Sequence, residues 1–261
     1  MKKIEKRSDA QIYELVYKPI DYPLDNNSLY TPLQVGSSRT NTDITAIKDN
    51  TGDNISRLNN FYSETTGTYW MWKNATQFLD YIGQCQYRRR IVLPEDADFR
   101  NILGENKIIV NRPLVFGETL KHQMERVHPQ IDTKILSEII HQKFPEYEHS
   151  YIKNFVNGNI LFYSTSYVMP VEKFNEYCRF LFGVLGYYVE YFGFNNTDVL
   201  RRYVEKKISE SMCSLKNTDI SYHSLIGGFI QERLASVYII GNFGDNDIIM
   251  KDFKLMEGLK Y

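Results

Sequence analysis

The chain has 261 residues, of which 43% are hydrophobic and 24% charged, so it has the composition of an ordinary globular protein with one large core. Its formal net charge of -1 argues against bulk electrostatic binding to nucleic acid. Cys85, Cys178 and Cys213 are isolated in the sequence, which argues against a disulfide framework and a zinc site. We therefore expect a single domain over residues 1–261.

The N-terminal residues predict a flexible basic tail over positions 1–9. MKKIEKRSDA is basic, but no apolar segment follows it as in a signal peptide. No stretch approaches the ~18 apolar residues that span a bilayer. We expect a cytoplasmic protein, with at most peripheral contact between the tail and an anionic membrane surface.

The first third of the chain predicts two short strands and one long helix. Residues 11–16 (QIYELV) alternate as in a strand, and residues 33–36 (LQVG) form a short apolar piece that ends at a glycine. Residues 55–73 predict a helix with Asp53 or Ser56 as its N-cap.

The rest of the chain predicts an alternation of strands and helices. The predicted strands are residues 81–86, 107–110, 160–169 and a closing strand at 238–242. The predicted helices are residues 118–128, 132–144, 201–213, 228–237 and a strong helix that begins at Pro170 and Val171. This alternation favours an α/β layered fold with a mainly parallel sheet.

A polar loop, DNTGDNIS at residues 49–56, leads into the segment that contains both tryptophans, Trp70 and Trp72. Asn and Asp side chains compete for backbone hydrogen bonds and therefore favour turns. Such a dense polar loop beside the chain's only indoles predicts the floor of a site for a polyanionic ligand.

The order of motifs along almost the whole chain resembles that of the bacterial capsule and O-antigen glycosyltransferases that include galactofuranosyltransferases. The matching residues are DNTGDNIS at 49–56, Asn59, Glu64, Thr66, YWMWKN at 69–74, Gly83, Cys85, YRR at 87–89, EYCRFLF at 176–182 and GFIQERL at 228–234. The resemblance implies a GT-A-like fold and transfer of a sugar to a growing surface glycan. It implies a UDP-sugar donor, for which UDP-galactofuranose is the most specific expectation, and a glycan or lipid-linked glycan acceptor.

The family pattern changes at three places in this chain. Gln86 replaces a histidine, Tyr17 and Lys18 stand where His-Lys is usual, and Thr165–Ser166 replaces an Asn-Met pair. These changes keep a second hypothesis open, a non-catalytic module that binds a nucleotide-sugar or a glycan. A third is a nucleotide-sugar hydrolase or phosphotransferase, which would give product without an acceptor.

Three consecutive arginines follow the strand predicted at residues 81–86. Guanidinium groups match phosphate oxygens and can stabilise a departing diphosphate as a metal does elsewhere. The alternative is a solvated basic strand end. With the family match, we expect Arg88 and Arg89 to be catalytic and Tyr87 to bind the donor, while Arg90 alternates away.

Glu232 is the expected catalytic base, because an inverting transfer needs a carboxylate that takes the proton of the acceptor hydroxyl. The alternative is a structural role for Glu232, either paired with a nearby arginine or capping a helix, and the family resemblance favours the base. Arg233 is expected to hold phosphate or this carboxylate.

The remaining donor-binding candidates are polar or aromatic residues of the matched segments. Glu64 and Lys73 bind the donor or form a buried structural ion pair, and the aromatic rings stack on a base or sugar or belong to the core. Ser56 alternatively caps a helix. The set comprises Lys18, Gly36, Asp49, Asp53, Asn54, Ser56, Asn59, Glu64, Tyr69, Trp70, Trp72 and Lys73.

Asp96 and Asp98 form a short Asp-x-Asp that resembles the metal-holding motif of many GT-A enzymes and could hold Mn²⁺ or Mg²⁺ through oxygen ligands. They lie past the strand end where such a motif normally sits, and exposed loop acids are the usual state. We therefore expect no metal ligands and no cofactor, with these two aspartates as the alternative.

Overall fold

The computed structural model describes residues 9–19, 27–211 and 219–256. The strands there are β1 (Ala10–Val16), β2 (Tyr30–Gln34), β3 (Ile47–Lys48), β4 (Tyr81–Gln86), β5 (Arg89–Ile91), β6 (Ile108–Asn111), β7 (Leu114–Val115), β8 (Ile160–Leu161), β9 (Tyr167–Pro170), β10 (Ile248–Lys251) and β11 (Phe253–Leu255). The α-helices are α1 (Asn59–Tyr62), α2 (Thr65–Asn74), α3 (Phe99–Leu103), α4 (Leu120–Val127), α5 (Thr133–Lys143), α6 (Glu148–Tyr151), α7 (Val171–Phe192), α8 (Thr197–Ser211), α9 (Ile220–His223) and α10 (Ile226–Asn242).

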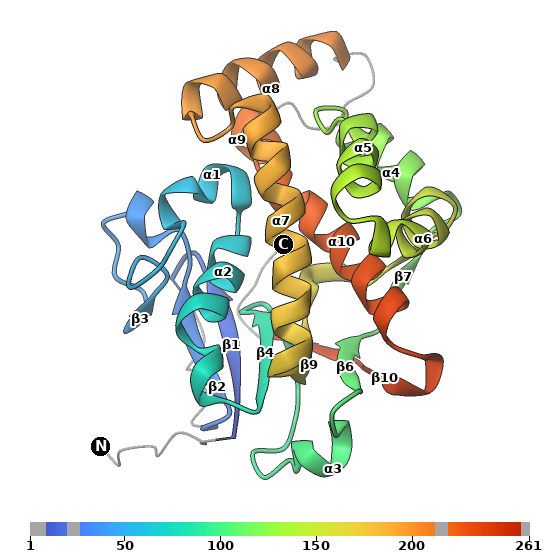
Figure 1. The fold of residues 1–261 in the computed structure, drawn as a ribbon. Helices are drawn as coiled ribbons and strands as arrows, with labels where there is room; N and C mark the ends of the chain where they lie inside the picture. Colours follow the sequence, from blue (N-terminus) through green and yellow to red (C-terminus); the bar gives the residue numbers. More distant parts are fainter. Residues whose placement is uncertain (1–8, 20–26, 212–218, 257–261) are drawn as a thin grey trace.

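The predicted α/β fold is confirmed. The central sheet has the order β10-β6-β9-β4-β1-β2-β3, and β5 and β11 extend it from the end of β4. Strands β3, β2, β1 and β4 are parallel, and β9 is inserted antiparallel between β4 and β6. The sheet is therefore mixed but mainly parallel, with helices packed against it (Figure 1).

Both faces of the sheet are covered. All seven residues of β1 are buried, and their side chains alternate between two apolar clusters. Tyr13 and Leu15 face the larger cluster, which includes α2, α7 and α10. Ile12 faces the smaller cluster, which includes Phe99 of α3.

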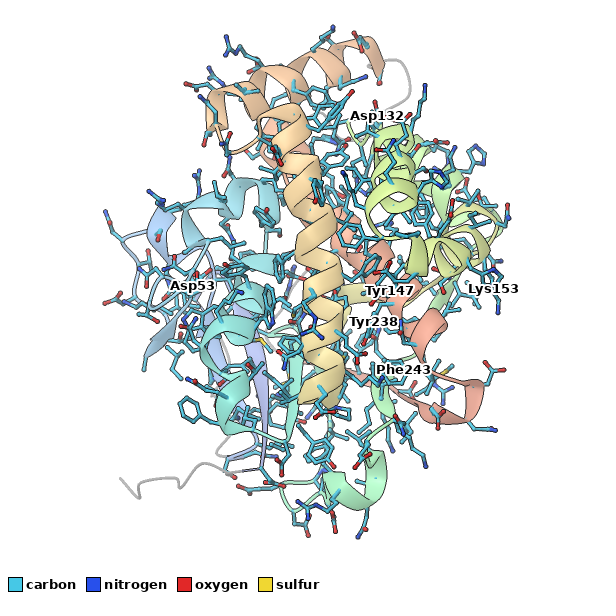
Figure 2. All side chains as sticks on the ribbon, in the orientation of Figure 1. Asp53, Asp132, Tyr147, Lys153, Tyr238 and Phe243 are labelled. Atoms are coloured by element: carbon cyan, nitrogen blue, oxygen red, sulfur yellow. The ribbon has the colours of Figure 1, made fainter. Side chains whose placement is uncertain are left out.

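Helix α7 packs in the larger cluster, and it passes over β4 and β9 in Figure 1. It begins at Val171 directly after Pro170, and it ends at Gly193, whose φ of 71° is left-handed. Figure 2 shows Tyr147 and Tyr238 beside this helix, with ring centroids 6.3 Å apart. The helix predicted from Pro170 and Val171 is thus confirmed.

Two predicted elements are interrupted in the structure, and a third has the wrong type. The helix expected at residues 55–73 is divided at Ser63, which has a φ of 52°. The strand expected at 160–169 is interrupted by a 3-10 turn that ends at Thr165, with a φ of 44°. The closing strand expected at 238–242 is the last part of α10, because a short buried apolar run fits a helix as well as a strand.

Two predictions reach beyond the described residues. Of the basic tail expected at 1–9, Asp9 alone is described, and the helix expected at 201–213 is described as far as Ser211. Cys213 also lies outside the described residues. No helix within the described ranges combines the length and apolar character needed to cross a membrane.

Candidate functional site

A cavity of about 650 Å³ lies at the carboxyl edge of the parallel strands. Tyr17 follows β1, Val35 follows β2 and Gln86 ends β4, and all three line it. Ligands of open α/β sheets bind outside this edge, because the loops there diverge from the sheet. The opposite wall is built by α4, α9, α10 and the β7–β8 pair, and it includes Gln123, Val127, His128, Tyr222, Phe229, Glu232, Arg233, Leu114 and Leu161.

Arg88, in the turn between β4 and β5, and Arg89, the first residue of β5, both line the cavity. Arg88 Nη2 donates to the hydroxyl of Tyr17 at 2.9 Å, and Arg89 Nη1 donates to Gln86 Oε1 at 2.9 Å. The guanidinium of Arg89 also lies 4.8 Å from the ring centroid of Tyr163. Each guanidinium is thus oriented at the cavity wall by a neutral partner, which leaves its charge uncompensated by these contacts.

Arg90 points away from the cavity, as the alternation predicts. Its Nε lies 2.6 Å from Glu14 Oε1 in a buried ion pair, and its guanidinium lies 4.4 Å from the ring centroid of Tyr30. Arg90 therefore links β5 to β1, whereas Arg88 and Arg89 line the cavity.

Two carboxylates line the cavity. Glu232, on α10, has its Oε2 2.9 Å from Arg233 Nη1, so the structural pair that the sequence left open is formed. Glu64, directly before α2, accepts a hydrogen bond of 2.7 Å from Gln86 Nε2. The sequence-based alternative of an ion pair between Glu64 and Lys73 is wrong. Lys73 Nζ lies instead over the ring of Trp72, 3.5 Å from its centroid.

Burial raises the pKa of Glu64 to about 7. The hydrogen bond from Gln86 acts against this rise, the charge of Glu232 adds to it, and the charges of Arg88 and Arg89 oppose it. Glu64 is therefore partly protonated near neutral pH. Perturbed carboxyl groups of this kind concentrate at functional sites.

A buried hydrogen-bond network lies directly beneath these carboxylates. Thr65 donates to Gln231 Oε1 at 2.5 Å, and Gln231 Nε2 donates to Thr68 at 3.1 Å. Thr68 in turn donates to Gln84 Oε1 at 2.8 Å, and Gln84 Nε2 donates to the carbonyl of Thr165 at 2.9 Å. The network therefore joins α2, α10, β4 and the turn before β9 below the cavity.

The far wall is built around Arg233 and His128. Arg233 is buried, donates to Gln123 Oε1 at 2.7 Å, and has a pKa lowered by that burial. The His128 ring stacks on Phe229 with centroids 3.7 Å apart. Burial, together with the charge of Arg233, lowers the pKa of His128 to about 3, so this imidazole is neutral at physiological pH.

The residues of the polar loop, 49–56, do not line the cavity. Asn59, which follows the loop in the chain, does line it. Asp49 is fully buried and accepts hydrogen bonds from the backbone N–H groups of Gly36 at 2.8 Å and Ser37 at 3.0 Å, and from Ser56 Oγ at 2.6 Å. These contacts fold the loop against the end of β2. Gly36, Asp49 and Ser56 therefore support the wall of the cavity without lining it.

The aromatic residues of α2 hold this loop in place. Tyr69 donates to Asp53 at 3.2 Å and Trp70 Nε1 donates to Thr51 at 2.9 Å. Trp72 stacks on Phe182 of α7 with centroids 5.6 Å apart. Figure 2 shows Asp53 on the loop side of α2. The structure does not bring the following predicted donor-binding residues to the cavity lining: Lys18, Asp53, Asn54, Tyr69, Trp70, Trp72, Lys73 and Tyr87.

Asp96 and Asp98 lie at the opposite edge of the sheet. Asp98 caps α3 by accepting from the backbone N–H of Asn101 at 3.1 Å. The adjacent Arg100 lies 3.6 Å from Asp80, directly before β4. These aspartates therefore do not fit a metal that would serve the cavity. Elsewhere in the described part of the chain, no cluster of three or more His, Cys, Asp or Glu side chains has a metal-binding arrangement.

Sequence reasoning missed several residues of the cavity wall, including Gln86, Gln123, His128, Tyr163 and Tyr222. Gln86 was identified only as a departure from the family pattern. His128 has no sequence signal of its own, because its partners Phe229 and Arg233 are distant along the chain.

The chain matches, over residues 11–216, the family model described as a domain of unknown function, DUF4422. Among solved structures, the apo structure of the WbbM bifunctional glycosyltransferase is similar, with a TM-score of 0.69 and 22% sequence identity. The match covers 96% of this chain and 46% of that chain, so the protein spans about half the length of this relative and shares its fold. No curated protein matches the chain. Since the family model covers most of the sequence, the chain belongs to the DUF4422 family.

Proposed function

We propose that this protein is a glycosyltransferase that moves a sugar from a nucleotide-sugar donor to a hydroxyl group of a glycan acceptor. One observation supports the proposal most strongly: Glu232 is distant in sequence from Arg88 and Arg89, yet all three line one cavity at the carboxyl edge of the parallel strands. The fold likeness to a bifunctional glycosyltransferase supports it.

The arginines supply electrostatic stabilisation of the leaving group. As the bond between the anomeric carbon and the diphosphate breaks, negative charge develops on the phosphate oxygens. Guanidinium groups donate in a planar geometry that fits these oxygens. Hydrogen bonds to Tyr17 and Gln86 orient the side chains of Arg88 and Arg89, which reduces the reorganisation needed during transfer.

Glu232 supplies the base in this proposal. The acceptor oxygen attacks the anomeric carbon from the face opposite the diphosphate, so a carboxylate must take its proton on that side. Glu232 lies on α10, whereas Arg88 lies in the β4–β5 turn and Arg89 begins β5. This placement supports an inverting reaction.

The sequence resemblance supports the finer assignment of substrates. It favours a UDP-sugar donor, with UDP-galactofuranose first among candidates, and a capsule or O-antigen glycan as acceptor. The cavity combines the charged residues with apolar lining from Leu114, Phe116 and Leu161. Such mixed lining suits a sugar ring, which has both apolar faces and hydroxyl edges.

Calorimetric titration with UDP, GDP, CDP and CMP, each with EDTA and again with Mn²⁺, tests the proposal. We expect UDP to bind with EDTA present and Arg89→Ala to weaken this binding at least tenfold. Arg100→Ala is the matched control, since that exposed arginine lies at the opposite edge of the sheet. Binding of none of the nucleotides would overturn the proposal. Binding of UDP without turnover of any UDP-sugar would favour the non-catalytic module.

A further inference from the structure

We propose that Glu64 is a second catalytic carboxylate, which shares with Glu232 the proton taken from the acceptor hydroxyl. This inference rests on the proposed glycosyl transfer, and it changes the role of Glu64 from donor binding to proton transfer. Both side chains line the same cavity, and they come from different elements: Glu64 precedes α2 and Glu232 lies on α10.

The surroundings of the two carboxylates differ in a way that assigns the proton. Glu232 Oε2 lies 2.9 Å from the guanidinium of Arg233 and so has a positive charge directly beside it. Glu64 accepts its 2.7 Å hydrogen bond from Gln86, a neutral amide, and it forms no ion pair within 4.0 Å among the described residues. When the pair holds one proton, Glu64 is therefore the carboxylate that carries it.

The charged groups that face Glu64 are Glu232 from α10, Arg88 from the β4–β5 turn and Arg89 from the start of β5. Glu232 favours the protonated form of Glu64, and the two arginines favour its charged form. Burial outweighs these charges and raises the pKa of Glu64 to about 7. A base is most effective when its pKa lies near the operating pH, and Glu64 meets this condition.

The buried network fixes the relative position of the pair. Thr65 is the chain neighbour of Glu64 and Gln231 is the chain neighbour of Glu232, and the two are joined by a hydrogen bond of 2.5 Å. Gln86 also connects Glu64 to Arg89, because it donates to the carboxylate and accepts from the guanidinium. The side-chain amide of Gln86 thus connects Glu64, which holds the proton, with Arg89 of the proposed diphosphate site.

The transfer step follows from this arrangement. The acceptor oxygen forms a bond to the anomeric carbon as the bond from that carbon to the diphosphate oxygen breaks. The electron pair of the broken bond leaves with the nucleoside diphosphate beside Arg88 and Arg89. The hydroxyl proton passes to the carboxylate pair and resides on Glu64. Its release to solvent restores the site.

The pair is tested without substrate by NMR titration of carboxyl groups in protein labelled with ¹³C at glutamate. We expect one resonance that titrates near pH 7, is missing in Glu64→Gln, and titrates at lower pH in Glu232→Gln. Glu105→Gln, an exposed glutamate at the opposite edge of the sheet, should leave this resonance unchanged. A Glu64 resonance that titrates in the ordinary range of about 4 to 5 would overturn the proposal, whatever the activity.

Turnover of a UDP-sugar measured against pH tests the catalytic role. We expect the wild-type rate to fall about tenfold per pH unit below 7, and Glu64→Gln to lower kcat at least 100-fold, with KM for the donor changed less than threefold. Glu64→Asp keeps a carboxylate and should retain part of the rate and the acidic limb.

A purely structural role would give Glu64→Gln an unchanged pH profile, and that result would overturn the catalytic assignment. Absence of both UDP binding and turnover would instead remove the transferase proposal. In that case a resonance near pH 7 that shifts in Glu232→Gln would still support the coupled carboxylate pair.

Discussion

Thr65 donates a buried hydrogen bond of 2.5 Å to Gln231, and each of these residues directly neighbours a carboxylate of the cavity. The contact therefore holds the start of α2, which Glu64 directly precedes, against the turn of α10 that carries Glu232. Buried polar networks that are fully paired fix one arrangement of the surrounding elements. The geometry of the site depends on this network as well as on the residues exposed to the cavity.

Gln231→Leu should destabilise the protein, because it leaves the Thr65 and Thr68 hydroxyl groups without their Gln231 partner in the interior. We expect the free energy of unfolding to fall by about 1–3 kcal/mol, measured by urea denaturation. Gln142→Leu, on the exposed face of α5, is the matched control and should change it by less than about 0.5 kcal/mol. Equal effects of the two variants would show that the network contributes no stability.

Glu14→Gln should be strongly destabilising, because it removes the negative charge that lies 2.6 Å from the buried guanidinium of Arg90. Breaking a buried pair from one side costs about 3–5 kcal/mol, whereas replacing both partners with apolar residues is often neutral. The double variant Glu14→Leu/Arg90→Met should therefore recover most of the loss in chemical denaturation. A double variant as unstable as the single one would contradict this account.

Glu64→Gln should stabilise the protein at alkaline pH and leave it unchanged under acid. The folded-state pKa of Glu64, about 7, lies above its ordinary value of 4.5, so the folded protein binds the proton more tightly than the unfolded chain. The stability that this proton confers is complete below pH 4.5 and is lost as the pH rises through 7. We expect the variant to gain about 1–3 kcal/mol over wild type at pH 8, with the gain vanishing near pH 4.5.

Urea denaturation at several pH values between 4.5 and 8 measures this difference. The comparison must use the difference between the variant and wild type, because His128 titrates in the opposite sense. Its lowered pKa of about 3 makes stability fall as the pH drops below 6.5. A difference that is constant with pH would show that Glu64 titrates alike in the folded and unfolded states.

Sequence patterns predicted the elements whose partners lie nearby along the chain. The strands β1 and β4 and the helix α7 have a periodicity that local propensity and burial both support. The division between α1 and α2 was not predictable, because the left-handed conformation of Ser63 is held by Asn59, which donates to its carbonyl at 2.6 Å. Such conformations depend on tertiary contacts that no local pattern encodes.

The candidate site was predicted in part for a similar reason. Arg88, Arg89 and Glu232 lie in compact motifs, and the structure places all three at one cavity. The interaction between Glu64 and Gln86 crosses from α2 to β4 and gives no sequence signal. The tryptophans were conspicuous in sequence, yet Trp70 packs the polar loop and Trp72 packs against Phe182.

Gly36→Ala should disturb the cavity indirectly, through Asn59, although Gly36 does not line the cavity. Its φ of 68° is left-handed, and a Cβ atom there would lie 2.7 Å from Cγ and Oδ1 of Asn59, which does line the cavity. The substitution must strain the backbone or displace Asn59. We expect a loss of about 1–2 kcal/mol in the free energy of unfolding and weaker binding of UDP by calorimetry.

The matched control is Gly186→Ala, on α7. No atom lies within 4 Å of the Cβ that this alanine would add, and alanine favours a helix over glycine by about 1 kcal/mol. The control should therefore stabilise the protein and leave UDP binding unchanged. If Gly36→Ala instead matched Gly186→Ala in both measurements, the loop around Asp49 would be free to adjust, and its hydrogen bonds to Gly36 and Ser37 would not fix the wall of the site. Loss of UDP affinity in Gly36→Ala alone would show that the backbone at Gly36 positions the cavity residue Asn59.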